Sequence, residues 1–97
     1  MNAGVARAVV WVGGQVQGVG FRWWVSRRAG ELRLAGHVEN LWDGRVRIDA
    51  QGHPDAVDAL VGMATQQPAP PDRPGRVTST LVERRDPDPD VVGFDVR

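Results

Sequence analysis

The chain is 97 residues long and carries 12 arginines, no lysine and 12 acidic residues, so its formal net charge is zero. This length suits one compact domain, and we predict that residues 1–97 form a single domain around one core. A balanced charge provides no general positive field, so we expect neither nucleic acid nor a membrane surface as a partner. The absence of cysteine excludes disulfides and thiolate metal sites.

The sequence contains no segment of the kind that directs a protein out of the cell or into a bilayer. Residues 1–7 have no apolar core like that of a signal peptide, and no apolar run approaches the roughly 18 residues of a membrane helix. We therefore expect a cytoplasmic protein, and we expect it to be a monomer.

The first half of the chain predicts a strand, a helix and a hairpin. Residues 8–12 (AVVWV) are short and β-branched and run into Gly13 and Gly14, which predicts a strand that ends in a loop. From residue 21 the apolar spacing becomes that of one helical face, with Phe21, Trp24, Val25, Ala29 and Leu32 on a single stripe. Residues 37–41 then look extended, residues 43–44 (DG) signal a hairpin turn, and residues 46–50 alternate as a half-buried strand.

The second half predicts another helix and two strands. Residues 52–55 (GHPD) favour a helix start, and an apolar stripe continues to Ala64. The proline-rich segment 66–76 predicts a loop, residues 77–84 alternate as a strand, and residues 93–96 form a short final strand. The order β-α-β-β-α-β with a terminal strand predicts a split βαβ sandwich, in which one antiparallel sheet carries both helices on one face.

A glycine-rich loop joins the first strand to the first helix. Four glycines within residues 13–20 allow successive backbone N–H groups to converge, and the loop opens onto a helix N-terminus that favours an anion. Arg22, in the first helical turn, can hold two phosphate oxygens at once. Val19 stands where a nucleotide-triphosphate loop has its lysine, and Trp23 stands where a dinucleotide fingerprint has its third glycine. These residues favour a phosphate cradle, although the glycines alone equally suit a tight turn with a solvated arginine.

Two longer motifs decide between these alternatives. Residues 15–22 (QVQGVGFR) closely resemble the first signature of the acylphosphatase family, and residues 36–46 (GHVENLWDGRV) resemble its second. The resemblance extends from Arg7 to the final strand. It implies a ferredoxin-like α+β fold, which agrees with the element order, and an enzyme that hydrolyses acyl phosphates to a carboxylate and inorganic phosphate.

The resemblance also implies the roles of individual residues. Arg22 would be the substrate-binding arginine, and Asn40 would position the water for in-line attack. The phosphate would be held by Arg22 and by a loop formed by Gln15, Val16, Gln17, Gly18, Val19 and Gly20. An acyl phosphate would be the substrate, and inorganic phosphate would be both product and inhibitor. Three features depart from the family pattern: Gln15 replaces a cation, His37 replaces a tryptophan, and residues 68–75 are rich in proline.

This chemistry requires few side chains. The leaving group is a carboxylate, whose conjugate acid has a pKa of about 4–5, so its departure needs no general acid near neutral pH. The protein has to neutralise the phosphoryl oxygens and place a water in line. The sequence lacks HExxH and paired-cysteine patterns, so we expect no metal and no other cofactor.

The remaining histidines and tryptophans fit structural roles better than catalytic ones. His37 lies three residues before Asn40, which places the two on opposite faces of a strand. His53 begins a helix and is expected at the surface or in a cap. Trp24 belongs to the core stripe and Trp23 faces away from it. Trp42 lies in the hairpin turn near the expected site, where an acyl group could touch it.

Three rival functions use the same topology. An RNA-recognition module stacks bases on aromatic residues of its central strands, but residues 45–50 (RVRIDA) contain none. A regulatory domain that kept the fold and lost activity would not need Arg22 and Asn40. An acylphosphatase-like module detached from a larger carbamoyl-transfer protein stays open as a third reading.

Overall fold

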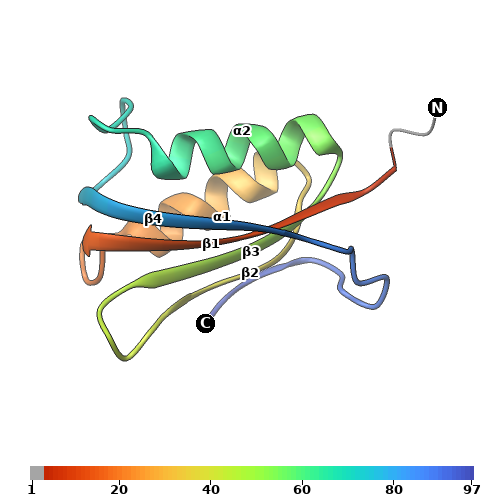
Figure 1. The fold of residues 1–97 in the computed structure, drawn as a ribbon, viewed down its shortest axis with the longest axis horizontal. Coiled ribbons are helices and arrows are strands. Elements are labelled where there is room, and N and C mark those ends of the chain that lie inside the picture. The colour runs from red at the N-terminus through yellow and green to blue at the C-terminus, as the bar shows by residue number, and fades with distance from the viewer. Residues whose placement is uncertain (1–3) are drawn as a thin grey trace.

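The computed structural model describes residues 4–97, which form a five-stranded sheet with two helices packed on one face (Figure 1). The strand order is β4-β1-β3-β2-β5. The strands are β1 (Ala6–Gln15), β2 (Ala35–Asn40), β3 (Val46–Gly52), β4 (Arg76–Arg85) and β5 (Phe94–Val96), and the helices are α1 (Phe21–Glu31) and α2 (Pro54–Thr65). This is the predicted ferredoxin-like α+β sandwich.

The four longer strands pair antiparallel as predicted, whereas β5 joins β2 in parallel and makes the whole sheet mixed. The connection explains this direction. Strand β4 ends at the same end of the sheet at which β2 begins. The chain then crosses to the opposite edge and turns back beside β2, so that Gly36 pairs with Phe94 and Val38 with Val96.

The core lies between the sheet and the helices, and its pattern follows the predicted periodicities. Alternate residues of the central strands face the helices and are almost wholly buried, as Val10, Val38 and Ile48 show. The α1 stripe is confirmed, because Phe21, Trp24, Val25 and Ala29 are all buried against the sheet. Burial of this apolar surface is the main stabilising contribution, at about 25 cal/mol per Å².

Strands β1 and β2 both include glycines that the sequence-based prediction left outside a strand. Strand β1 does not end at Val12 but continues through Gly13 and Gly14 to Gln15, because these residues still pair with β4 across a register shift. Strand β2 begins at Ala35 rather than at the predicted residue 37, so Gly36 lies inside it, with φ of 139°. A Cβ built there would lie 1.8 Å from the backbone oxygen of Asp49, so only glycine allows this close approach of β2 to β3.

Helix α2 begins as its sequence predicts. The imidazole Nδ1 of His53 accepts a hydrogen bond of 3.1 Å from the backbone N–H of Asp55, and Pro54 occupies the first helical turn. His53 is therefore a helix cap, as expected. In the described part of the chain, neither helix is long and apolar enough to cross a membrane.

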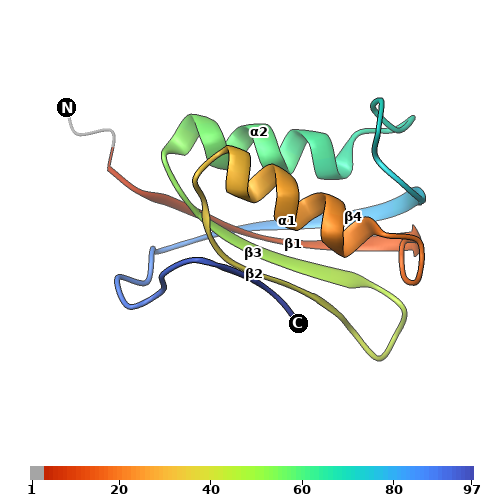
Figure 2. The ribbon, with the colours of Figure 1, turned by 180° about the vertical axis from the view of Figure 1, so that it is seen from behind.

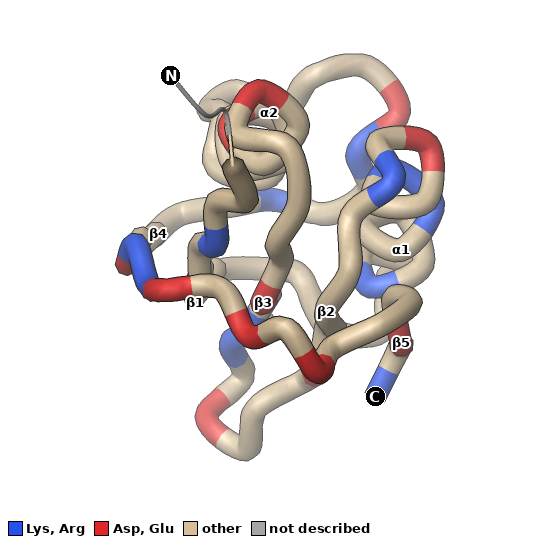
Figure 3. The backbone as a smooth tube through the Cα atoms, turned by 90° about the vertical axis from the view of Figure 1, so that its right-hand side faces the viewer, with Lys and Arg blue, Asp and Glu red and all other residues tan. Residues whose placement is uncertain are grey.

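The two ends of the sheet carry different parts of the chain. At one end lie the end of β1, the start of α1, the end of β2, the 41–45 hairpin and the 66–75 loop; these segments gather on the right of Figure 2. At the other end lies the 86–93 connection, whose acidic residues are drawn red in Figure 3. The predicted phosphate loop and Asn40 thus come to the same end because β1 and β2 run in the same direction.

Candidate active site

The segment between β1 and α1 forms the predicted anion-binding loop. Gly18 and Gly20 have φ of 74° and 92°, in the left-handed region that glycine adopts most readily. Gly20 is the residue that precedes α1. Among residues 4–97, no side chain caps this helix start, and no acidic residue lies in its first turn. The first N–H groups of α1 are therefore left for an anion.

A small hollow lies over this helix start. Its volume is about 220 Å³, and its lining residues are Val16, Gly18, Gly20, Phe21, Arg22 and Trp23. Four of these residues also belong to the predicted phosphate-binding set. Asn40 does not line this hollow, so the loop with Arg22 and the end of β2 with Asn40 form two separate parts of the predicted site.

Arg22 extends from the first turn of α1 toward the far edge of the sheet. Its guanidinium donates one hydrogen bond to the backbone oxygen of Arg97, just beyond β5. A guanidinium has five N–H groups, so four remain for another acceptor. Within residues 4–97, no carboxylate side chain forms an ion pair with Arg22. The hydrogen bond to Arg97 thus positions the guanidinium of Arg22, and no acidic side chain among residues 4–97 neutralises its charge.

Asn40 is the last residue of β2 and lies on the helix-covered face, because Val38, two residues earlier, is buried in the core. Its side-chain Oδ1 is buried and accepts no hydrogen bond within the described chain. Buried polar atoms in proteins are almost always paired, and an unpaired one marks a place where a ligand or a water can bind. Within residues 36–46, Asn40 is the residue with such a buried, unpaired side-chain atom.

Gln17 connects the two parts of the site, a role that the sequence did not reveal. Its Nε2 donates to the backbone oxygens of Leu41 at 2.8 Å and of Arg45 at 3.0 Å. Both carbonyls belong to the hairpin that follows Asn40. The side chain of Gln17 therefore holds the loop against the hairpin, and only its backbone is left to contact a phosphate.

The other predicted loop residues occupy distinct positions. Gln15 is the last residue of β1 and pairs with Arg76. The side chain of Val16 is buried in the core. Val19 is 44% exposed and lies against Gly75, where an added Cβ would come within 3.0 Å of it. The loop is thus supported from the core, from the hairpin and from the start of β4.

The hairpin beyond Asn40 is closed by Asp43. This carboxylate accepts hydrogen bonds from the backbone N–H of Arg45 at 3.0 Å and from its guanidinium at 2.8 Å. The backbone hydrogen bond is the main reason why the pKa of Asp43 is lowered, and the guanidinium adds to it. Asp43 therefore stays ionised near neutral pH and is committed to the turn.

His37 and Trp11 lie on the open face of the sheet, away from this site. The Nε2 atom of His37 is 2.9 Å from Oε2 of Glu39 and 3.2 Å from the guanidinium of Arg47. The ring of Trp11 has the guanidinium groups of Arg47 and Arg85 at 5.6 and 5.7 Å from its centroid. These contacts give both side chains structural partners, and the one aromatic residue of the central strands is already covered by cations.

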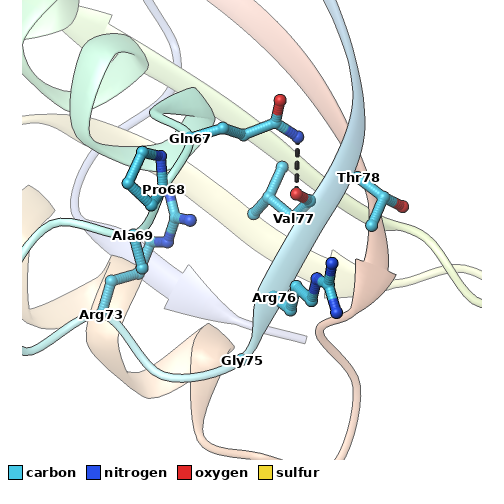
Figure 4. Close-up of a pocket in the computed structure, with 8 residues that line it drawn as sticks. All are labelled: Gln67, Pro68, Ala69, Arg73, Gly75, Arg76, Val77 and Thr78. Carbon is cyan, nitrogen blue, oxygen red and sulfur yellow. Dashed lines mark hydrogen bonds between the residues drawn. The ribbon is translucent and has the colours of Figure 1, made fainter.

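A second hollow, of about 450 Å³, lies between the 66–75 loop and the start of β4 (Figure 4). Gln67 donates to the backbone oxygen of Val77 at 2.5 Å. The buried guanidinium of Arg73 donates to the backbone oxygens of Met63 and Ala64 at the end of α2, and burial lowers its pKa. Arg73 and Arg76 extend in different directions, so they do not converge on one anion. Arg73 anchors the proline-rich loop to α2.

The chain was compared with known proteins. The family model described as Acylphosphatase matches residues 8–96. An acylphosphatase of Mycobacterium sp. (strain JLS) is 42% identical over 91 residues, which are 94% of this chain and 93% of that protein. The crystal structure of the acylphosphatase from Bacillus subtilis superimposes with a TM-score of 0.82 and 33% identity, over 95% of this chain and 98% of that one.

The fold also occurs inside a much larger protein. Full-length HypF in its phosphate- and nucleotide-bound form matches 97% of this chain but only 12% of its own length, with a TM-score of 0.81 and 22% identity. That likeness concerns the fold alone. The family match over residues 8–96 and the 42% identity to a protein of nearly equal length go further, and they establish that this chain belongs to the acylphosphatase family.

Proposed function

We propose that this protein hydrolyses acyl phosphates, with the phosphate held by the Gln15–Gly20 loop and Arg22 and with the attacking water held by Asn40. The family to which the chain belongs supports the reaction. The observation that supports the site most directly is the uncapped start of α1, beside an arginine with four free N–H groups and close to an unpaired asparagine oxygen. Positive charge, backbone donors and a polar amide thus meet at one end of the sheet.

The proposed reaction divides the work between these groups. The loop N–H groups and Arg22 neutralise the three phosphoryl oxygens, whose charge persists through the transition state. The amide of Asn40 orients a water on the side of the phosphorus opposite the leaving oxygen. The P–O bond to the acyl group breaks as the bond to water forms, and the acyl group departs as a carboxylate. The water loses a proton to solvent, and inorganic phosphate remains.

Metal ions have no part in this proposal. Within residues 4–97, no three side chains of His, Asp or Glu come together in a group that could hold one. We expect turnover to be unchanged by exhaustive chelation. A loss with EDTA that a divalent ion restores would contradict the proposed mechanism.

Two substitutions test the division of roles. Arg22→Gln should weaken competitive inhibition by inorganic phosphate and also lower turnover, because the cation is needed in both states. Asn40→Ala should leave phosphate inhibition nearly intact while kcat falls by about 10²–10³, the scale for losing one positioned polar group. Urea unfolding of each variant controls for folding. A folded Asn40→Ala variant with near-normal kcat would show that Asn40 does not position the water.

A further inference from the structure

We propose that a hollow between Trp23 and Pro74 binds the acyl group of the substrate, and that Trp23 makes the enzyme prefer acyl phosphates with a flat aromatic acyl group. This inference rests on the proposed function and extends it to substrate choice. The hollow has a volume of about 520 Å³, within the range of sites for small organic ligands. Its lining residues are Gly20, Trp23, Trp24, Ser26, Arg27, Asp72 and Pro74.

The hollow adjoins the phosphate cradle directly. Gly20 and Trp23 line both this hollow and the smaller one over the start of α1. A Cβ built on Gly20 would lie 3.9 Å from Cγ of Pro74, so the proline ring stands immediately beside the loop. The atoms that follow a phosphate held on the loop would therefore lie next to this hollow.

The topology places this hollow on the side that the leaving group should occupy. Strand β1 carries the phosphate loop, and the sheet order is β4-β1-β3-β2. Asn40 ends β2, two strands from β1 on one side, whereas Pro74 precedes β4, the neighbour of β1 on the other side. In-line displacement puts the attacking water and the leaving oxygen on opposite sides of the phosphorus. With water at Asn40, the acyl group points toward Pro74.

The lining residues suit a flat apolar group. Trp23 is 69% exposed, a large apolar surface that the fold itself does not bury, whereas Trp24 is buried beside it. An aromatic face binds another flat apolar group by offset stacking. Of the two charged side chains of the lining, Asp72 is ion-paired with Arg28 at 3.8 Å, which leaves Arg27 at the opposite side of the aromatic surface.

Trp23→Ala, compared with Trp42→Ala, tests the inference. Trp42, the other tryptophan that the sequence placed near the expected site, is 98% exposed in the hairpin and lines none of the hollows described above, so the two variants distinguish the two possible acyl contacts. The quantity to measure is the ratio of kcat/KM for benzoyl phosphate to that for acetyl phosphate. We expect this ratio to fall about tenfold in Trp23→Ala, as for one lost aromatic contact. It should stay within about twofold of wild type in Trp42→Ala and in Trp23→Phe, which keeps a flat ring.

Other outcomes would overturn the inference. A ratio unchanged by Trp23→Ala, or lowered by Trp42→Ala instead, would place the acyl group elsewhere. A wild-type preference for succinyl phosphate over benzoyl phosphate would show that Arg27 selects an anionic acyl group. Failure to hydrolyse any of the three acyl phosphates would refute the proposed function, and this inference with it. Urea unfolding confirms that each variant is folded.

Discussion

Replacement of Gln17 should separate phosphate binding from turnover while Arg22 and Asn40 both stay in place. Its amide donates to the carbonyls of Leu41 and Arg45, so Gln17→Met removes two hydrogen bonds and keeps the length of the side chain. Leu41 O still accepts from the N–H of Gly44, and Arg45 O still accepts from that of Leu41, so neither carbonyl is left unpaired. With a net value of about 0.5–1.5 kcal/mol for each of the two bonds, we expect a loss of about 1–3 kcal/mol in the free energy of unfolding.

The functional effect should fall on turnover rather than on phosphate binding. Without Gln17, the loop is no longer held against the hairpin that follows Asn40. In the proposed mechanism, phosphate binding needs the loop and Arg22, whereas turnover also needs the correct distance to Asn40. We therefore expect kcat for acetyl phosphate to fall about 10-fold to 100-fold, while the inhibition constant of inorganic phosphate changes less than threefold.

The matched control is Gln66→Met, at an exposed glutamine just after α2 whose side chain makes no hydrogen bond within the described residues. It should change stability by less than about 0.5 kcal/mol and leave kcat unaltered. Steady-state kinetics, phosphate inhibition and urea unfolding on the three proteins complete the comparison. If Gln17→Met retains wild-type kcat while losing the expected stability, the bridge supports the fold alone and our account of site geometry is wrong.

Two further predictions concern the frame of the fold. Asp49 is 7% exposed, and its carboxylate accepts hydrogen bonds of 2.7 and 2.9 Å from the guanidinium of Arg7. Burial raises the pKa of Asp49, but these hydrogen bonds and the charge of Arg7 outweigh burial, so the pKa is lowered. The stabilisation is therefore present above the unfolded pKa of about 3.9 and is lost as the pH falls through the lower folded value. Asp49→Asn should cost about 1.5–3 kcal/mol at pH 7 and flatten the loss below about pH 4, as urea unfolding at several pH values would show. Gly36→Ala should abolish folding or cost more than about 3 kcal/mol, since its Cβ meets a backbone oxygen at 1.8 Å, whereas Gly62→Ala, in open space on α2, should stabilise by about 0.5–1 kcal/mol in the same assay.

Periodicity was enough to predict the layers of this fold. The stripe from Phe21 to Ala29 and the alternation of Val46, Ile48 and Ala50 both depend on neighbours within one element, and burial confirmed them. The parallel direction of β5 was not predictable in this way, because it depends on the end of the sheet at which β4 stops and the connection to β5 begins. The length of β1 was underestimated because Gly13 and Gly14 have no side chains to signal a strand, although β4 pairs with them.

The sequence indicated the parts of the candidate site but not their connections. The glycines before Arg22 and the motif around Asn40 are local signals, and the structure brings both to one end of the sheet. The bridge from Gln17 joins residues 24 and 28 positions apart, and the contact between Arg22 and Arg97 spans 75 positions. No pattern within a short window encodes such contacts. The hollow beside Trp23 likewise depends on Pro74, which the fold alone brings near the loop.

The burial of Val16 has a consequence for how this protein can evolve. Val16 belongs to the proposed phosphate loop and, at 1% exposure, also to the core. Because its neighbours are close-packed, a change of one methylene under the loop displaces the backbone that carries the N–H groups. A larger enzyme can repack its interior far from its catalytic groups. Here the interior and the proposed binding loop share a residue, so we expect substitutions in the core and substitutions that alter phosphate binding to be selected together.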